Sequence, residues 1–441
     1  MTMILSGGTV VTGLTPARLS LADVVVEGTR IEALGRGSPG GPERDCSGCL
    51  IVPGNVCAHT HLYSALARGM PYSLEPPRNF HQILQRIWWR LDRALDGDII
   101  RASALAAATE ALLSGTTTVV DHHASPASIE GSLNLIADAL EEVGLRSILC
   151  YEVSDRDGPE RARAGIEENR RFLRSARPLA RGMVGAHASF TLSEETLDEC
   201  AALARDTGSG IHVHVAEDEV DQRDSLARFG KPVVERLADA GVLGERGVAA
   251  HCVHLHPSEI ELLRESRTTI AHNPRSNMNN GVGTAPAYGL GEAVALGTDG
   301  IGTDMFDESR IAFWRAREED VLVSPSWPLE RLARGAAFAG ACFGEPALGA
   351  IESGAPADLV VLEYSEPTPL TDANLPGHWL FGLHAGLVRD VMVNGEMVVQ
   401  DRRPTGVDHE KIAAEARAAA ERLWGRLEEI EPHSFEPMGG R

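Results

Sequence analysis

The sequence contains no run of about 18 apolar residues, the length that a membrane-spanning helix needs, so we expect no membrane partner. Residues 1–12 lack the basic and then apolar order of a secretory signal. Cysteine is also scarce, because the 441 residues include only seven, scattered along the chain and odd in number. Such usage suits a reducing compartment better than a disulfide framework. We therefore expect a cytoplasmic protein.

Basic residues are too few to balance the acidic ones. The chain has 41 Lys and Arg against 63 Asp and Glu, which gives a formal net charge of −22. The acidic groups are spread along the chain, and such a surface repels nucleic-acid polymers and anionic membranes. A small neutral or cationic substrate is easier to accommodate. The length permits a large core and favours two structural units.

Several short motifs of other enzyme classes are missing as well. The chain has no H-E-x-x-H, which disfavours a zincin protease. It has no H-x-E with P-C-x-x-C, which excludes the cytidine-deaminase type of zinc site. Gly281-Val282-Gly283 has Pro286 where a nucleotide-binding loop has its third glycine. Cys46 and Cys49 form a lone C-x-x-C, which we interpret as free thiols in a surface loop, with a redox or metal role as the alternative.

What the sequence does contain is an alternation of short apolar segments and amphipathic ones between residues 56 and 350. Helical periodicity marks intervening stretches such as 99–113, 128–143 and 193–205. Eight strand–helix units predict an α/β fold, a (β/α)8 TIM-type barrel. The eight expected strands are 56–61, 116–121, 146–153, 183–188, 210–215, 247–252, 268–272 and 293–298.

The two chain ends have a different pattern, of short strands and turns. Asn394-Gly395 stands between alternating apolar residues, which is a strong hairpin signal. We predict one small β-sandwich built from residues 1–55 and 351–405. Residues 407–431 are rich in Ala, Glu, Arg and Leu, so residues 406–441 are predicted to form a closing helix and tail.

Polar residues gather where the predicted barrel strands end. His59 and His61 alternate on one strand, so both imidazoles can face one ion. Because functional side chains of such barrels meet at the C-terminal mouth, we expect these strand-end residues to converge. Three imidazoles and a carboxylate suit Zn²⁺ or Fe²⁺ and leave room for one water. The set comprises His59, His61, His187, His214, Glu217, His251, His272 and Asp299.

Other interpretations stay open for single members of this set. One histidine at a strand end is often only a satisfied polar group, and Asp299 could begin a turn. His212 shares the strand parity of His214 but lies deeper, so packing is expected. For His122 and His123 we expect supporting positions rather than ligation.

The chain resembles the amidohydrolase superfamily, in its cytosine, guanine and S-adenosylhomocysteine deaminase and chlorohydrolase branch. The resemblance rests on Pro53-Gly54 before His59-x-His61 and on later motifs that span nearly the whole chain. Within the branch it is most similar to the SsnA-type aminohydrolases, which are associated with purine catabolism. The later motifs are Gly185-Ala186-His187, His214-Val215-Ala216-Glu217, Ala250-His251, His272-Asn273-Pro274, Gly297-Thr298-Asp299-Gly300 and Trp88-Trp89-Arg90-Leu91-Asp92.

The resemblance implies a role for each matching residue. His59, His61, His214 and Asp299 would bind one divalent metal, for which zinc is favoured over iron. Glu217 would shuttle a proton from the activated water to a ring nitrogen, and Asp299 would orient the water and help protonate the leaving amine. His251 would stabilise the developing charge, and His187 would contact substrate. Residues 183–188 contain no lysine to bridge two metals, which favours one.

The same resemblance suggests a substrate, a metal-activated deamination of a guanine-like or oxidised purine. Relatives that deaminate nucleosides carry an acidic residue where Leu91 is the best-aligned position in this chain, so a free heterocycle is favoured. Arg68, Gln82 and Arg275 could contact it, since a guanidinium matches a carbonyl and an adjacent nitrogen; surface ion pairs are the alternative for the arginines. Two further hypotheses are displacement of chloride or another group from a triazine- or pterin-like ring, and a catalytically silent metal-stabilised scaffold. Relatives suggest a homodimer.

Overall fold

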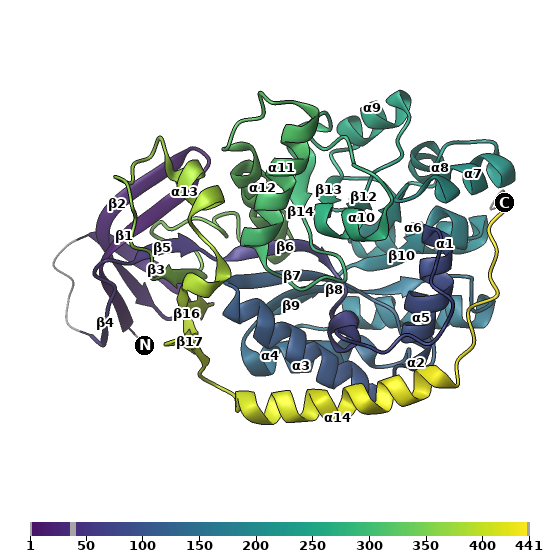
Figure 1. Ribbon diagram of the computed structural model, residues 1–441, viewed down its shortest axis with the longest axis horizontal. Coiled ribbons are helices and arrows are strands. Elements are labelled where there is room, and N and C mark those ends of the chain that lie inside the picture. The colour runs from purple at the N-terminus through teal and green to yellow at the C-terminus, as the bar shows by residue number, and fades with distance from the viewer. Residues whose placement is uncertain (1, 36–40, 439–441) are drawn as a thin grey trace.

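The computed structural model describes residues 2–35 and 41–438, which form two units (Figure 1). The larger unit is a barrel of eight parallel strands surrounded by helices, as the sequence predicts. Its strands are buried throughout, which accounts for their nearly continuous apolar sequences. In sheet order they are β6 (Asn55–Thr60), β7 (Thr116–His123), β8 (Arg146–Val153), β10 (Val184–Ala188), β11 (Ile211–Val215), β12 (Val248–His251), β13 (Thr269–His272) and β14 (Val294–Leu296).

The barrel closes between its first and last strands. The backbone N–H groups of Thr298 and Asp299 donate to the carbonyl oxygen of His59 at 2.9 and 3.1 Å. This approach requires a glycine at position 297, because a Cβ there would lie 2.4 Å from Asn273 Oδ1 and 2.9 Å from the nitrogen of His59. The closure therefore places Asp299 directly beside the first predicted metal ligand.

Helices cover the outside of the barrel. Helix α6 begins as its sequence predicts, because the Ser193 hydroxyl accepts the N–H of Thr196 at 3.1 Å. In chain order the covering helices are α3 (Gly97–Leu113), α4 (Ser132–Val143), α5 (Pro159–Leu173), α6 (Glu194–Thr207), α7 (Glu219–Phe229), α8 (Val233–Asp239), α9 (Pro257–Ser266), α10 (Pro274–Asn280), α11 (Met305–Glu319) and α12 (Trp327–Phe343).

The smaller unit is built from both chain ends, as predicted, and its strands form one continuous mixed sheet. Strand β5 pairs antiparallel with β15, which joins the two ends. Asn394 and Gly395 have φ values of 51° and 80° and form the predicted hairpin turn. Helix α13 (Leu375–Phe381) lies between β15 and β16 in the chain. The strands are β1 (Thr2–Leu14), β2 (Ala17–Glu27), β3 (Arg30–Gly35), β4 (Glu43–Asp45), β5 (Leu50–Pro53), β15 (Leu359–Leu362), β16 (Val388–Val393), β17 (Glu396–Gln400) and β18 (Arg403–Pro404).

The cysteine pair of this sheet differs from the prediction. Cys46 and Cys49 are free thiols in the loop between β4 and β5, as expected, but their side chains are buried although Ser47 and Gly48 between them are exposed. The guanidinium of Arg389 donates to both sulfur atoms at 3.4 Å. Burial raises the pKa of Cys46 to about 11, so this thiol stays protonated at neutral pH.

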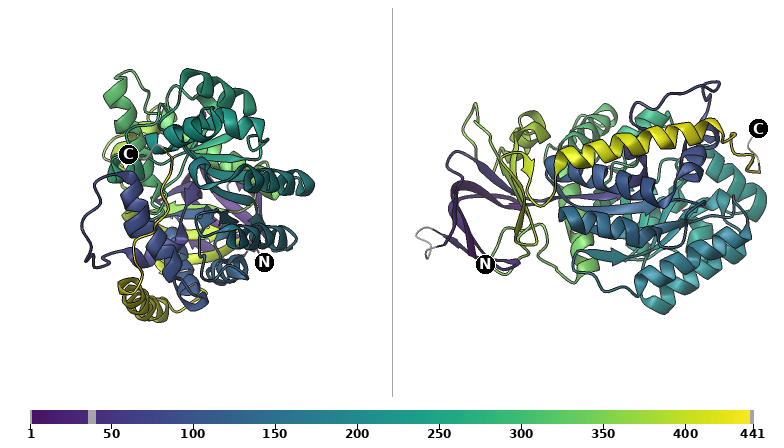
Figure 2. Two further views of the ribbon diagram at one scale, coloured as in Figure 1. Left: turned by 90° about the vertical axis from the view of Figure 1, so that its right-hand side faces the viewer. Right: turned by 90° about the horizontal axis from the view of Figure 1, so that it is seen from below.

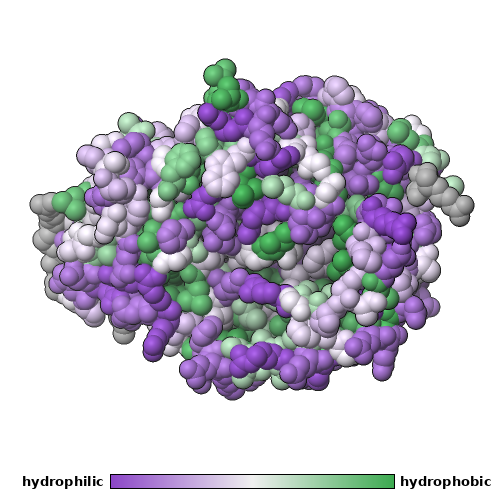
Figure 3. All heavy atoms as spheres, viewed as in Figure 1, coloured by the Kyte–Doolittle hydropathy of each residue, from purple (hydrophilic) through white to green (hydrophobic). Residues whose placement is uncertain are grey.

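The chain leaves the small unit through helix α14 (His409–Glu428) and runs along the barrel (Figure 2). Its buried side chains, which include Ile412, Ala419 and Leu423, lie against α3, and its outer face belongs to the hydrophilic lower edge seen in Figure 3. Beyond α14, the tail crosses the open end of the barrel. Within residues 2–35 and 41–438, no helix has both the length and the apolar character needed to cross a membrane.

One part of the barrel unit does not follow from the sequence pattern. Between β6 and α3, four helical elements form an insertion over the mouth of the barrel, and the last three are continuous over residues 80–94. They are η1 (Leu62–Ala67), α1 (Phe80–Ile83), η2 (Leu84–Trp88), which is a π-helical turn, and α2 (Trp89–Ala94). The π-helical turn interrupts the 3.6-residue period by which a regular helix is found in the sequence.

Candidate metal and substrate site

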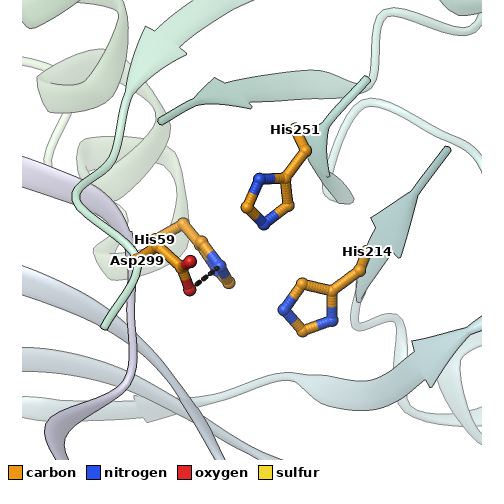
Figure 4. A group of neighbouring side chains, drawn as sticks. All are labelled: His59, His214, His251 and Asp299. Atoms are coloured by element: carbon orange, nitrogen blue, oxygen red, sulfur yellow. Dashed lines mark ion pairs between the residues drawn. The ribbon is translucent and has the colours of Figure 1, made fainter. Parts of the chain in front are cut away.

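The four predicted ligands lie together at the C-terminal ends of strands β6 and β11 and in the loop after β14. Nε2 of His61 is 3.0 Å from Asp299 Oδ1 and 3.2 Å from Nε2 of His214. Nε2 of His59 is 3.4 Å from the same Asp299 oxygen. The ligand atoms of His59, His214, His251 and Asp299 all lie within 4.8 Å of one another, and their side chains point to a common centre (Figure 4).

The backbone at these strand ends is unusual. Ala216, His251 and Asp299 have φ values of 46°, 71° and 52°, in the left-handed region that residues with a Cβ seldom adopt. Such conformations are concentrated at functional sites, where the surrounding fold holds a side chain in a required direction. In this protein they turn Glu217, His251 and Asp299 toward the cluster.

Each imidazole of the cluster is oriented through its second nitrogen. Nδ1 of His61 contacts the carbonyl oxygen of His122 at 2.5 Å, and Nδ1 of His214 contacts that of His187 at 2.9 Å. Nδ1 of His59 lies 2.8 Å from Nε2 of His212. Such partners fix the ring and direct Nε2 toward the centre of the cluster, where a metal could bind. Only packing was expected of His212 from the sequence, yet its ring orients that of His59, a predicted metal ligand.

The charge state of the cluster fits a divalent cation. Burial lowers the pKa of His59 to about 3 and that of His214 well below its usual value, so both imidazoles are neutral. Burial also opposes ionisation of Asp299, but the adjacent imidazoles of His59, His61 and His251 together outweigh burial and hold the pKa of Asp299 well below the ordinary range. Nε2 atoms of His59 and His251 are buried and make no hydrogen bond within the described residues. Neutral imidazoles beside a carboxylate are the donors that zinc and iron prefer.

At His61, a proton competes with a divalent cation for the lone pair of Nε2. Burial lowers the pKa of this imidazole, but the adjacent carboxylate of Asp299 outweighs burial and raises the pKa to about 9. A proton on Nε2 occupies the lone pair that a metal would need. Metal binding at this position therefore requires deprotonation.

Glu217 lies beside the predicted metal-binding cluster. Its carboxylate Oε2 lies 3.5 Å from Nε2 of His251, and Asn280 Nδ2 donates to Oε1 at 3.4 Å. Burial and the negative charge of Asp299 raise the pKa of Glu217 well above its usual value. A carboxyl group with a raised pKa next to an ionised carboxylate is the arrangement of a proton carrier.

A pocket of about 640 Å³, which includes solvent at its mouth, opens above these groups. Its apolar wall comes mostly from the insertion between β6 and α3, and its polar wall is acidic. His61, His187, His214, Glu217 and Asp299 all line it. The apolar residues include Phe80, Leu84, Trp88, Trp89 and Phe190, and the other acidic residues are Asp92, Glu152, Asp218 and Asp221.

Asp92 and Glu152 belong to a buried charge network that was not predicted from the sequence. The guanidinium of Arg156 lies between them, 2.6 Å from Glu152 Oε1 and 2.5 Å from Asp92 Oδ2. Burial raises the pKa of Asp92 to about 7, although Arg156 opposes the shift. The second oxygen of Asp92, Oδ1, is buried without a hydrogen-bond partner among the described residues. An unpaired acceptor on a pocket wall is available to a donor on a ligand.

The structure brings His187 to the pocket but not the other predicted substrate contacts. Nδ1 of His187 bonds the Thr191 hydroxyl at 2.6 Å, which directs the ring. Arg68 forms an exposed ion pair with Glu110, and Arg275 pairs with the buried Glu308. Both arginines line a separate hollow beyond Trp88 and Gly300.

Gln82 is also engaged elsewhere. Its Oε1 accepts the backbone N–H of Arg78 at 2.9 Å, and it is not among the pocket residues. His272 is buried at the end of β13, and its Nδ1 has no partner within the described chain. It is absent from the cluster of potential ligands.

Known proteins resemble this chain over nearly its full length. The 5'-deoxyadenosine deaminase of Methanosarcina mazei is 32% identical over 396 residues, which cover 87% of this chain and 88% of that protein. The 5-methylthioadenosine/S-adenosylhomocysteine deaminase of Pelotomaculum thermopropionicum is 34% identical over 447 residues, covering 96% and 99%.

Solved structures share the fold. An adenosine deaminase from Xanthomonas campestris with bound zinc aligns with a TM-score of 0.83 at 24% identity, over 96% of this chain and 98% of that one. The atrazine chlorohydrolase of Arthrobacter aurescens TC1 with zinc aligns with a TM-score of 0.79 at 22% identity, over 95% and 100%. The sequence profile of the amidohydrolase family matches residues 50–398. This chain therefore belongs to the amidohydrolase family and is a metal-dependent hydrolase.

Proposed function

We propose that the protein removes the exocyclic amine of a purine-type ring by hydrolysis with one bound zinc ion. The observation that carries this proposal is Glu217, a carboxyl group of raised pKa that lines the same aromatic pocket as the His and Asp cluster. The names of the curated relatives, which are deaminases of adenosine-type compounds, support the same reaction class.

The chemistry divides between the ion and the chain. A zinc ion held by His59, His61, His214 and Asp299 would lower the pKa of a water molecule toward neutrality. Glu217 delivers a proton to a ring nitrogen, which makes the adjacent carbon electrophilic. Asp299 accepts the proton of the attacking water and passes it to the amine. The water oxygen bonds the ring carbon, the carbon–nitrogen bond breaks, and ammonia leaves. The hydroxyl group left on the ring carbon returns its proton to Glu217 and becomes the carbonyl group of the product.

His251 completes the arrangement. Its Nδ1 is fixed by Asn277 Oδ1 at 2.8 Å, and its unpaired Nε2 faces the cluster. If Asn277 accepts the Nδ1 proton, Nε2 is an acceptor for the attacking water; in the imidazolium form it is a donor to the developing charge. Both roles stabilise the transition state more than the ground state.

For the substrate we propose an aminopurine that carries an uncharged, hydroxyl-bearing substituent, as an adenosine-type nucleoside does. The aromatic wall suits a planar ring, and the many acidic residues disfavour an anionic substituent. Asp92 lines the pocket and can accept a hydrogen bond from a hydroxyl group. The absence of an acidic residue at position 91 therefore no longer argues against a nucleoside. The guanine-like substrate was expected from the family resemblance, with Arg68, Gln82 and Arg275 as its suggested contacts, and it remains a prediction.

Ammonia release by the zinc-loaded protein tests the reaction. The panel should contain adenosine, 5'-deoxyadenosine, adenine, guanine, 8-oxoguanine, a pterin and a chlorotriazine. Ammonia from the adenosine-type compounds supports the proposal, and ammonia from guanine or 8-oxoguanine alone would favour the sequence-based expectation. Chloride release without ammonia would identify the dehalogenation alternative. Bound zinc without turnover of any ring would indicate the silent scaffold.

A further inference from the structure

The segment after α14 crosses the mouth of the barrel and is held there at several points (Figure 2). Arg90 Nε donates to the carbonyl oxygen of Ile430 at 2.6 Å, and Arg93 Nη2 donates to that of Glu431 at 2.7 Å. The backbone carbonyl oxygen of Gln85 accepts the backbone N–H of His433 at 3.0 Å. On the opposite side, the N–H of Met438 donates to Asp224 Oδ1 of α7 at 2.7 Å. The tail therefore joins the insertion to the far side of the mouth.

Two side chains of the tail stand directly behind the pocket wall. The ring of His433 lies 5.3 Å from that of Trp89, at a near-perpendicular angle of 72°. The ring of Phe435 lies 5.8 Å from Trp89 and 6.4 Å from Phe190. Trp89 and Phe190 line the pocket, whereas His433 and Phe435 do not. The tail thus forms a second layer that touches the wall and not the ligand space.

The insertion has little support of its own. Elements α1, η2 and α2 follow one another without a break over residues 80–94, and the π-helical turn interrupts the regular hydrogen bonding in the middle of the segment. A helical segment of about 15 residues is only marginally stable alone. These elements nevertheless supply Phe80, Leu84, Trp88, Trp89 and Asp92 to the pocket. Packing from outside must therefore hold these side chains in place.

The tail also reaches the buried charge network. His433 Nε2 lies 3.4 Å from Asp157 Oδ1, and Asp157 Oδ2 lies 3.4 Å from Nε of Arg156. Arg156 in turn orients Asp92 through its guanidinium. One residue of the tail is thus connected to both the aromatic and the acidic wall.

We propose that residues 430–438 are a positioning element of the substrate pocket, in which His433 and Phe435 fix the insertion and so set the affinity for the ring substrate. This inference rests on the proposed function for its kinetic consequence alone. The reacting groups lie on the barrel strands and the loops after them, so loss of the tail contacts should weaken substrate binding more than turnover.

The test compares Phe435→Ala and His433→Ala with the matched control Ser434→Ala. Ser434 is exposed, and its side chain makes no hydrogen bond within the described residues. Hydrogen exchange of the full-length zinc-loaded protein is measured by mass spectrometry, because it needs no substrate. We expect amides of residues 80–94 to exchange about tenfold faster in F435A and H433A, with the barrel strands unchanged.

Kinetics with the best substrate of the panel provide the second measurement. We expect KM to rise about tenfold in F435A while kcat stays within about threefold, since uniform binding is lost. Exchange and KM equal to those of S434A would overturn the proposal. A proportional fall of kcat together with zinc loss would also overturn it, because that outcome indicates general damage. Should F435A fail to fold, Phe435→Leu is judged by the same two criteria.

The two proposals can fail separately. If the wild-type protein turns over no ring compound, the proposed function fails, while the exchange comparison still decides whether the tail fixes residues 80–94. If ammonia is released but exchange and KM do not respond to F435A and H433A, the reaction stands and the positioning role is wrong.

Discussion

The strand ends of the barrel and the wall above them are two differently constructed parts of one site. His59, His214 and His251 belong to parallel strands of the barrel and are fully or almost fully buried. The wall consists of a helical segment with a π-helical turn and of a tail, both held by side chains from elsewhere in the chain. A rigid scaffold thus positions the reacting groups, and a separately supported layer shapes the space for the substrate.

This difference implies that a substitution can impair catalysis without impairing substrate binding, and the reverse. Substitutions at strand ends should change kcat or metal affinity, whereas substitutions in the wall should change KM. The following predictions test that separation.

Glu217→Gln should have the largest effect. The amide keeps the size of the side chain but cannot transfer the proton, so we expect kcat to fall about 1,000-fold. Zinc content, measured by atomic absorption, should stay at the wild-type ratio. Retention of more than a tenth of the wild-type kcat would remove Glu217 from the mechanism.

His212→Phe tests the partner behind a ligand. The phenyl ring fills the space but cannot hydrogen-bond Nδ1 of His59, so zinc affinity should fall about 10- to 100-fold. Competition with a chromophoric chelator measures the change. Wild-type affinity in this variant would show that packing alone accounts for His212, as the sequence analysis expected.

Zinc affinity should also depend on pH through His61. Because its pKa is about 9 without metal, zinc must displace one proton at neutral pH. The apparent zinc affinity should then rise about tenfold per pH unit between about pH 6 and pH 8, and lower pH should release the ion. The measurement is a chelator titration at several pH values, corrected for the chelator's own protonation. An affinity independent of pH would contradict competition between the proton and the ion for Nε2 of His61.

Asp92→Asn tests the wall. We expect KM for a hydroxyl-bearing nucleoside to rise about tenfold, the size of one lost hydrogen bond to a charged group, while KM for the free base stays unchanged. The free base serves as the internal control. Equal increases for both substrates would mean that Asp92 only supports Arg156.

Arg68→Ala should have the smallest effect. Its side chain is exposed and paired with Glu110 outside the pocket, and exposed ion pairs contribute about 0–1 kcal/mol to stability. We expect KM within about twofold of the wild-type value, a difference below the energy of one hydrogen bond. An increase of tenfold would instead support the substrate contact predicted from the sequence.

The difference between the barrel strands and the pocket wall also explains which parts of the site could be predicted from the sequence. The eight barrel strands follow from apolar runs that end in His, Glu or Asp, because buried parallel strands leave a clear composition. Their end residues His59, His61, His214 and Asp299 are brought together by the topology itself. Even the hairpin at Asn394-Gly395 follows from two residues, since that pair favours positive φ at both positions.

The wall could not be predicted in this way. Asp92, Glu152 and Arg156 are separated by up to 64 residues, and nothing in their local sequence indicates that they meet. Arg68, Gln82 and Arg275 looked suitable because of their chemistry. Arg68 and Arg275 instead pair with residues that are distant in the sequence, and Gln82 accepts the backbone N–H of Arg78. The homodimer and the cytoplasmic location remain predictions.

Closure of the barrel through Asp299 has a consequence for assembly of the protein. This residue and His59 are 240 positions apart, yet they share backbone hydrogen bonds and would share an ion. A nascent or truncated polypeptide that lacks the last strand cannot present the full ligand set, so tight metal capture can only follow complete folding. The ion would then favour the finished barrel over every partly folded form by mass action.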